Sequence, residues 1–197
     1  RACSSGLEAI NIAAMFVRAG EVDIAVAGGT ENMSQPPFLL DYRARFDGLR
    51  MGSSEIRDSL IGGLSCPVNR YHMGVGAENI AERYEISRQD QDDLALTSQR
   101  RAVAAMSEGR FEEQIVPVDV PQKKGDPITV STDEGPRQDT SMDILAGLRP
   151  IFKEGGTVTA GNASSINDGA AAVVIMSSDR AAELGLKPRL TWRSRGA

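Results

Sequence analysis

The residue best suited to covalent chemistry in this sequence is Cys3, in the segment Arg1-Ala2-Cys3-Ser4-Ser5-Gly6. A helical apolar pattern begins just after it. Unpaired backbone N–H groups and the positive end of the helix dipole at such a position favour a thiolate. The small residues that follow would let a bulky substrate approach the sulfur. Free cysteine is also among the most buried residue types, so the alternative is a space-filling side chain without chemistry.

His72 is the only histidine of the chain, and a lone histidine is a natural candidate for a general base. The competing interpretation is a structural histidine that makes a local hydrogen bond. The second cysteine, Cys66, has no helix start or basic partner nearby in the sequence, so we expect no role for it.

Residues 161–169 form a run of small and polar residues that could be mistaken for a phosphate-binding loop. The run lacks the lysine of a P-loop and the G-x-G-x-x-G spacing of a dinucleotide-binding fold. No cluster of His, Cys, Asp or Glu has the spacing of metal ligands, so we expect no metal.

Four motifs, in the right order, resemble the thiolase family of acetyl-CoA acetyltransferases and 3-ketoacyl-CoA thiolases. They are RACSSGLEAI at 1–10, VAGGTENMS at 26–34, YHMG at 71–74 and GNASSINDGAAA at 161–172. The likeness extends over essentially the whole chain.

This resemblance implies that Cys3 is the nucleophile that carries the acyl group. It implies that coenzyme A is substrate and product, with no separate cofactor. In the family, the histidine that activates the nucleophile belongs to a Gly-His-Pro motif near the C-terminus. That motif, an Asn-Glu-Ala-Phe segment and a second cysteine are expected beyond Ala197.

The resemblance also implies a set of residues that bind coenzyme A. Ser164 would meet an amide of the pantetheine arm, and Arg137 would lie near the adenine nucleotide. Ser165 stands where the family usually has glycine, beside this contact. The full set expected to bind coenzyme A is His72, Met73, Arg137, Phe152, Ala160 and Ser164.

Local patterns predict the elements that position these residues. Helices are expected at 7–19, ended by Gly20, and at 54–60, 76–84 and 178–184. A further helix should run from an S-x-x-D capping box at Ser87 to about 107. The apolar run at 22–29 is typical of a strand buried on both faces of a parallel sheet. Further strands are expected at 111–120, 128–132 and 170–176, and one begins at 190–192.

The resulting fold class is α/β: an incomplete thiolase-like N-terminal half-domain with an inserted α+β loop subdomain. We expect the first part of the core at 1–34, the insertion at 35–155, and the second part of the core at 156–197, which leads toward a missing C-terminal domain. Because the sequence opens without methionine and in the middle of a pattern, we expect it to be a piece of a longer protein.

Composition sets the remaining expectations. The net charge of −5 and the lack of a basic stretch argue against nucleic acid as a partner, and no apolar run is long enough to span a membrane. Two cysteines suit a reducing, cytoplasmic compartment. A thiol redox protein is disfavoured because no second cysteine lies close to Cys3. Residues 35–60 resemble the region that links dimers in tetrameric thiolases, so a homo-oligomer is expected.

The expected activity is that of an acyl-CoA C-acyltransferase, which condenses two acyl-CoA molecules or cleaves a 3-ketoacyl-CoA through an acyl-Cys3 thioester. The alternative is an inactive or merely CoA-binding fragment that lacks the C-terminal catalytic histidine and cysteine.

Overall fold

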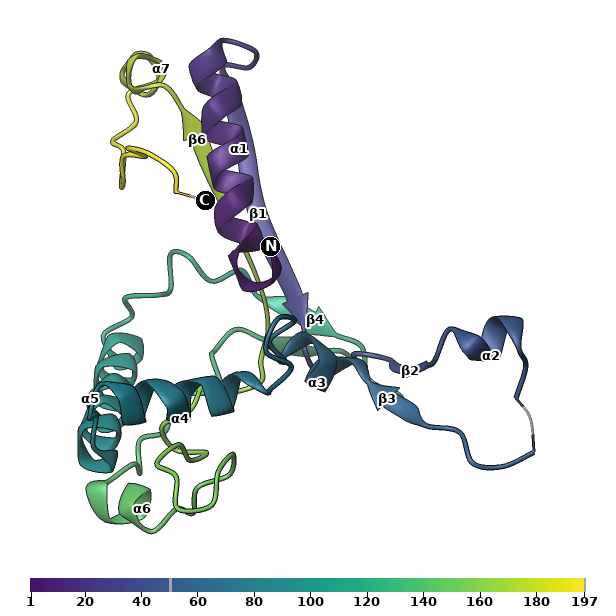
Figure 1. Ribbon diagram of the computed structural model, residues 1–197. Coiled ribbons are helices and arrows are strands. Elements are labelled where there is room, and N and C mark those ends of the chain that lie inside the picture. The colour runs from purple at the N-terminus through teal and green to yellow at the C-terminus, as the bar shows by residue number, and fades with distance from the viewer. Residues whose placement is uncertain (50, 197) are drawn as a thin grey trace. The chain divides into compact units, whose positions relative to one another are not determined.

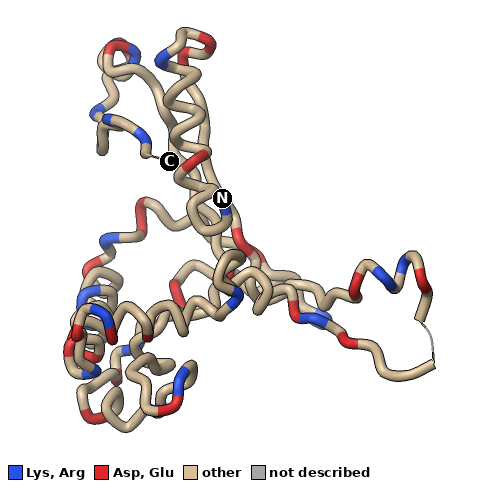
Figure 2. Tube along the Cα trace, viewed as in Figure 1, with Lys and Arg blue, Asp and Glu red and all other residues tan. Residues whose placement is uncertain are grey.

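A computed structural model describes residues 1–49 and 51–196. The chain divides into two compact units, Arg1–Gly63 with Ile166–Ala197, and Leu64–Ser165. The three-part division into 1–34, 35–155 and 156–197 stays a prediction. Over the described residues, Figure 2 shows acidic and basic residues intermixed in both units. Within the same residues, no helix is both long and apolar enough to cross a membrane.

The first unit is built on two long strands and one helix. Strand β1 (Ile24–Asn32) pairs antiparallel with β6 (Asp168–Met176), and α1 (Ser5–Ala19) packs along this pair, as Figure 1 shows. Helix α7 (Ser178–Glu183) follows β6. Gly20 ends α1 with a φ of 76°, which confirms the predicted glycine stop.

The predicted parallel pairing and two-sided burial of these strands are wrong for this unit. Within β1 only Ala27 is buried, while Val26 is 72% exposed and Val174 of β6 is 60% exposed. Among the described residues, α1 is the helix that packs most closely on this two-stranded sheet, and much of the apolar surface of the sheet stays open. The predicted strand at 190–192 is irregular instead.

In the first unit, the chain that follows β1 forms a small hairpin with two short helices. Strands β2 (Phe38–Leu40) and β3 (Ile56–Asp58) pair antiparallel, α2 (Arg43–Phe46) lies between them in sequence, and α3 (Ser59–Gly63) follows β3. Figure 1 shows α2 in the long connection that joins the two strands.

The helix predicted over 54–60 is therefore mostly wrong. Asp58 explains where the helix begins, because its carboxylate accepts a hydrogen bond from the N–H of Leu60 at 2.8 Å. Ser59 also donates its hydroxyl to the carbonyl of Pro37. These bonds hold residues 56–58 in the hairpin and start the helix at Ser59.

Most of the regular secondary structure of the second unit is helical. Helix α4 (Met73–Arg83) is followed by α5 (Arg88–Ser107), a hairpin of β4 (Val118–Val120) and β5 (Ile128–Val130), and α6 (Met142–Ala146). Its buried side chains come from α4, α5, α6 and residues 158–159. They are Glu78, Ala81, Asp92, Leu96, Leu145, Val158 and Thr159.

Side-chain caps fix the helix starts of this unit. The capping box at Ser87 is confirmed, because its side chain accepts from the N–H of Asp90 and the Asp90 carboxylate accepts from the N–H of Ser87. His72 caps α4, which starts three residues before its predicted start. The strand predicted at 111–120 is limited to its last three residues, because the carbonyl of Phe111 closes a turn.

The close approach of β1 to β6 generates a prediction about Gly28. A Cβ at this position would lie 2.6 Å from the carbonyl oxygen of Ala171, which is backbone and cannot move without disturbing the pair. We expect Gly28→Ala to lower the free energy of unfolding of the first unit by about 1–3 kcal/mol. Trp192, the only tryptophan, belongs to this unit, so its fluorescence in urea follows the transition.

Gly62→Ala is the matched control, because a Cβ there meets nothing within 4 Å. An equal urea midpoint for the two variants would contradict the steric argument.

Candidate active site

Cys3 lies where a short 3-10 helix, Ala2–Ser4, runs directly into α1. The turn is held by Ser4, whose hydroxyl donates to the carbonyl of Arg1 at 2.9 Å. Ala2 has a φ of 49°, in the left-handed region that is unfavourable for residues other than glycine. The thiol of Cys3 is exposed, at the helix start where the sequence predicted it, and so does not fill a core.

Two glycines bring the helix start close to the sheet. A Cβ on Gly29 of β1 would lie 3.3 Å from the Cα of Gly6 in the first turn of α1. Side chains here would push the two backbones apart. The pair therefore fixes how closely the turn that carries Cys3 approaches β1.

The end of β1 is tied to the start of β6 by Asp168. Its carboxylate accepts hydrogen bonds from the hydroxyl of Ser34 at 2.5 Å and from the N–H of Ser34 at 2.9 Å. These two bonds lower the pKa of Asp168 below its ordinary value, so the carboxylate stays charged at neutral pH. The sequence analysis gave neither residue a role, although both stand in the quoted motifs.

In the second unit, three of the residues expected to bind coenzyme A come together at the start of α4. The rings of His72 and Phe152 are stacked, with centroids 4.8 Å apart and an interplanar angle of 18°. Met73, the first residue of α4, is 54% exposed. The stacked rings of His72 and Phe152 give an apolar surface with one polar edge, and Met73 follows His72 in the sequence.

The imidazole of His72 is fixed by its own helix. Its Nδ1 accepts the N–H of Gly74 at 3.0 Å, so the neutral ring carries its proton on Nε2. This is the local hydrogen bond that the structural interpretation of His72 expects. It occupies only one ring nitrogen, and the role of His72 in binding coenzyme A stays a prediction.

Ala160 and Ser164 lie on a loop that follows Phe152, and both are exposed. The loop is tied to the Phe152 segment because the N–H of Ile151 donates to the carbonyl of Val158 at 3.2 Å. Asn162 closes the turn around Ala160, since its side-chain oxygen accepts the N–H of Thr159 at 2.8 Å. These bonds fix the backbone around Ala160, and Ser164 follows this turn two residues after Asn162.

Arg137 is also exposed, on the segment between β5 and α6. Its backbone N–H donates to the side-chain oxygen of Gln99 in α5 at 2.8 Å. This bond fixes the backbone at Arg137 and leaves the guanidinium to other contacts. The part of Arg137 in nucleotide binding stays a prediction.

Cys66 has polar contacts that the sequence analysis missed. The backbone N–H of Asn69 donates to its sulfur at 3.4 Å, and this bond, with a further one from Val68, lowers the pKa of the thiol. The signal in the sequence was the turn Cys-Pro-Val-Asn, whose asparagine can reach back three residues. Cys66 is less exposed than Cys3.

Among the described residues, no group of three or more His, Cys, Asp and Glu side chains is placed to hold a metal ion.

Comparison with known proteins gives a consistent result. The family model described as "Thiolase, N-terminal domain" matches residues 1–179. A probable acetyl-CoA acyltransferase of Staphylococcus epidermidis is 52% identical over 198 residues, covering 100% of this chain and 50% of the relative. An acetyl-CoA acetyltransferase of Chromobacterium violaceum is 52% identical over 187 residues, covering 94% of this chain and 47% of the relative.

Solved structures agree. The crystal structure of the Bacillus anthracis acetyl-CoA acetyltransferase matches with a TM-score of 0.87 and 44% identity, over 94% of this chain and 46% of that one. The acetyl-CoA acetyltransferase of Syntrophomonas wolfei gives a TM-score of 0.85 and 48% identity.

The mixed α/β fold and these matches define a thiolase-like α/β protein. The chain belongs to the thiolase family, and its residues 1–179 match the model of the family's N-terminal domain. It spans about half the length of the curated relatives it matches.

The exposed position of Cys3 generates a prediction about alkylation. At neutral pH we expect iodoacetamide to label Cys3 before Cys66, because Cys3 is exposed at a helix start while Cys66 is less exposed. The measurement is mass spectrometry of tryptic peptides over time. Single-cysteine variants, Cys66→Ser and Cys3→Ser, serve as controls. Equal labelling rates would contradict the argument from the greater exposure of Cys3.

Proposed function

We propose that this chain supplies the nucleophile and part of the coenzyme A site of an acyl-CoA C-acyltransferase. The observation that carries the proposal is Cys3, exposed at the start of α1, in a chain 52% identical to a protein named acetyl-CoA acetyltransferase. The thiolate of Cys3 attacks the carbonyl carbon of an acyl-CoA. The bond from that carbon to the sulfur of coenzyme A breaks, and coenzyme A leaves as a thiol after taking up a proton.

The second half of the reaction transfers the acyl group from Cys3. In condensation, the α-carbon of a second acyl-CoA loses a proton to a base and attacks the acyl-Cys3 carbonyl, which releases the Cys3 thiolate and a 3-ketoacyl-CoA. Thiolysis is the same sequence reversed. The first half exchanges the thioester of the acyl-CoA for the thioester of acyl-Cys3, which changes little in energy and supports a reversible acylation of Cys3.

The coenzyme A side of the site is proposed to lie in the second unit. The stacked rings of His72 and Phe152, with Met73 beside them in sequence, offer apolar surface for the pantetheine arm. Ala160 and Ser164 supply the small side chains and the hydroxyl that such an arm needs. Arg137 would pair with phosphate or stack on the adenine.

We propose that coenzyme A serves as substrate and product and that the reaction needs no separate cofactor. We also propose that the reaction belongs to fatty acid metabolism. We propose a cytoplasmic homo-oligomer, a dimer of dimers, without nucleic acid or membrane partners. The exposed apolar side chains around β2 and α2 support self-association. They include Phe38, Leu39, Leu40, Tyr42 and Phe46.

The second candidate is a chain that binds coenzyme A without turnover. Two observations favour this candidate. The relatives are about twice as long as this chain, and His72 is the only histidine of the sequence. With Nδ1 already accepting from Gly74, His72 serves α4, and a base for both proton transfers has to come from elsewhere.

One experiment separates the two candidates and generates a prediction for residues 1–197 alone. Mixed with acetyl-CoA, they should slowly gain an acetyl group on the Cys3 peptide, and Cys3→Ser should not. Thiolysis of acetoacetyl-CoA should stay far below about 1 s⁻¹, because positioned proton transfer is typically worth about 10²–10⁴-fold for each missing group. Turnover at about 1 s⁻¹ or more would contradict the need for a further base.

Ser164 gives a prediction for the full-length protein that carries this sequence. Ser164→Ala removes one hydrogen bond to coenzyme A, so we expect a loss of about 0.5–1.5 kcal/mol, seen as a higher KM with little change in kcat. Ser131→Ala is the control, because Ser131 is another exposed serine of the second unit and has no proposed role at the coenzyme A site. A normal KM with a collapsed kcat would show that Ser164 acts elsewhere in the reaction.

A further inference from the structure

The loop that carries Ala160 and Ser164 is held by two carboxylates that the proposed chemistry does not use. Glu78 of α4 is 3% exposed and Asp92 of α5 is 2% exposed. Acidic residues are almost never this buried unless they are paired or hydrogen-bonded. Each of the two therefore needs donors, and both find them on residues 157–162.

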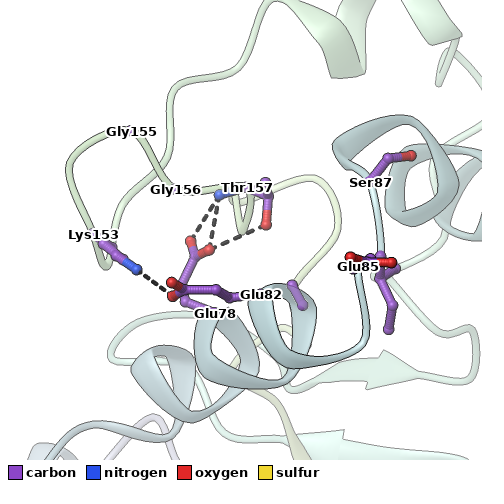
Figure 3. Close-up of a pocket in the computed structure, with 10 residues that line it drawn as sticks. Glu78, Glu82, Glu85, Ser87, Lys153, Gly155, Gly156 and Thr157 are labelled. Atoms are coloured by element: carbon purple, nitrogen blue, oxygen red, sulfur yellow. Dashed lines mark hydrogen bonds and ion pairs between the residues drawn. The ribbon is translucent and has the colours of Figure 1, made fainter.

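Glu78 accepts from two consecutive backbone N–H groups of the loop. The N–H of Thr157 lies 2.9 and 3.0 Å from its two oxygens, and the N–H of Val158 lies 2.8 Å from Oε1. The hydroxyl of Thr157 adds a third donor at 3.1 Å. Figure 3 shows the carboxylate of Glu78 pointing from α4 to the Thr157 backbone.

Burial raises the pKa of Glu78, but the hydrogen bonds from Thr157 and Val158, with the nearby charge of Lys153, outweigh this effect. The pKa of the carboxyl is thereby lowered, and Glu78 holds the loop as an anion at neutral pH. Gly156 allows the approach, because a Cβ there would lie 2.3 Å from Oε1 of Glu78.

Asp92 holds the other end of the same loop. Its Oδ2 accepts from Nε of Arg88 at 2.7 Å, and its Oδ1 accepts from the side-chain amide of Asn162 at 2.9 Å. The same amide donates to the carbonyl of Thr157 at 3.1 Å. Asn162 is also the residue that closes the turn around Ala160, so Asp92 fixes the turn through it.

We propose that Glu78 and Asp92 are positioning residues for the coenzyme A site: by fixing residues 157–162 from α4 and α5, they set where Ala160 and Ser164 meet the pantetheine arm. This inference rests on the proposed function. It assigns a binding role to two side chains that do not themselves touch the substrate.

The test uses the full-length protein that carries this sequence, with Glu78→Gln and Asp92→Asn. In each variant the side chain keeps one oxygen that can accept a hydrogen bond, and an NH₂ group takes the place of the other oxygen. That NH₂ group faces N–H donors and cannot accept from them. In hydrogen exchange followed by mass spectrometry, the peptide over 156–163 should exchange about tenfold faster. In thiolysis of acetoacetyl-CoA, the KM for coenzyme A should rise about tenfold while kcat stays within about twofold.

Glu82→Gln is the matched control. Glu82 lies one turn after Glu78 on α4, is exposed, and pairs with Lys153 at 2.8 Å. Its variant should leave the exchange rates and KM as they are. If Glu78→Gln does not fold, Thr157→Val decides, since it removes only the hydroxyl bonds to Glu78 and Gln91 and should raise KM about threefold.

Unchanged exchange and KM in the folded variants would overturn the positioning role. Faster exchange with an unchanged KM would also overturn it, because the carboxylates would then serve the fold alone. If the unmodified protein neither binds nor turns over coenzyme A, the proposed function fails, and the inference fails with it. Measuring the unmodified protein before any variant distinguishes this failure from a failure of the positioning role alone.

Discussion

A charged carboxylate in a protein interior is tolerated only where donors replace the water it has lost, and Glu78 meets this condition with two backbone N–H groups and a hydroxyl. The second unit depends on this bond set. It joins α4 to a loop about 80 residues later in the chain, and Asp92 joins the same loop to α5. An irregular segment thereby gains a fixed shape without belonging to a helix or strand.

The first unit obeys a different constraint, the close approach of backbones without side chains. Gly28 lies against Ala171 of β6, and Gly29 lies against Gly6 of α1. The pair Gly28 and Gly29 of β1 thus allows the close approach of β6 and of α1 to the same strand. The exposed thiol of Cys3 depends on this packing, since its turn continues into the same helix.

Features encoded within a few residues could be predicted from the sequence. The helix ended by Gly20 and the capping box at Ser87 both follow from neighbours less than a turn apart. The antiparallel pairing of β1 with β6 could not be predicted, because the partners lie more than 130 residues apart and an apolar run does not reveal its direction. The helix expected at 54–60 failed because Asp58 starts the helix later than the apolar pattern implies.

The candidate site divides in the same way. Cys3 could be predicted because its motif is local and because the apolar helical pattern after it shows where the helix begins. Glu78 and Asp92 could not, since an acidic residue on a polar helix has the same appearance in sequence whether it faces water or a buried loop. Only the fold shows that these two carboxylates point inward.

The stacking of Phe152 on His72 has a consequence for how this surface can vary among relatives. A Cβ on Gly74 would lie 2.4 Å from the ring of Phe152, and the N–H of Gly74 is what orients His72. A larger residue at position 74 would displace the ring of Phe152. The imidazole of His72 would then lose its stacking partner. Positions 72, 74 and 152 should therefore change together during evolution, so that a relative with a side chain at position 74 also has a smaller residue at 152.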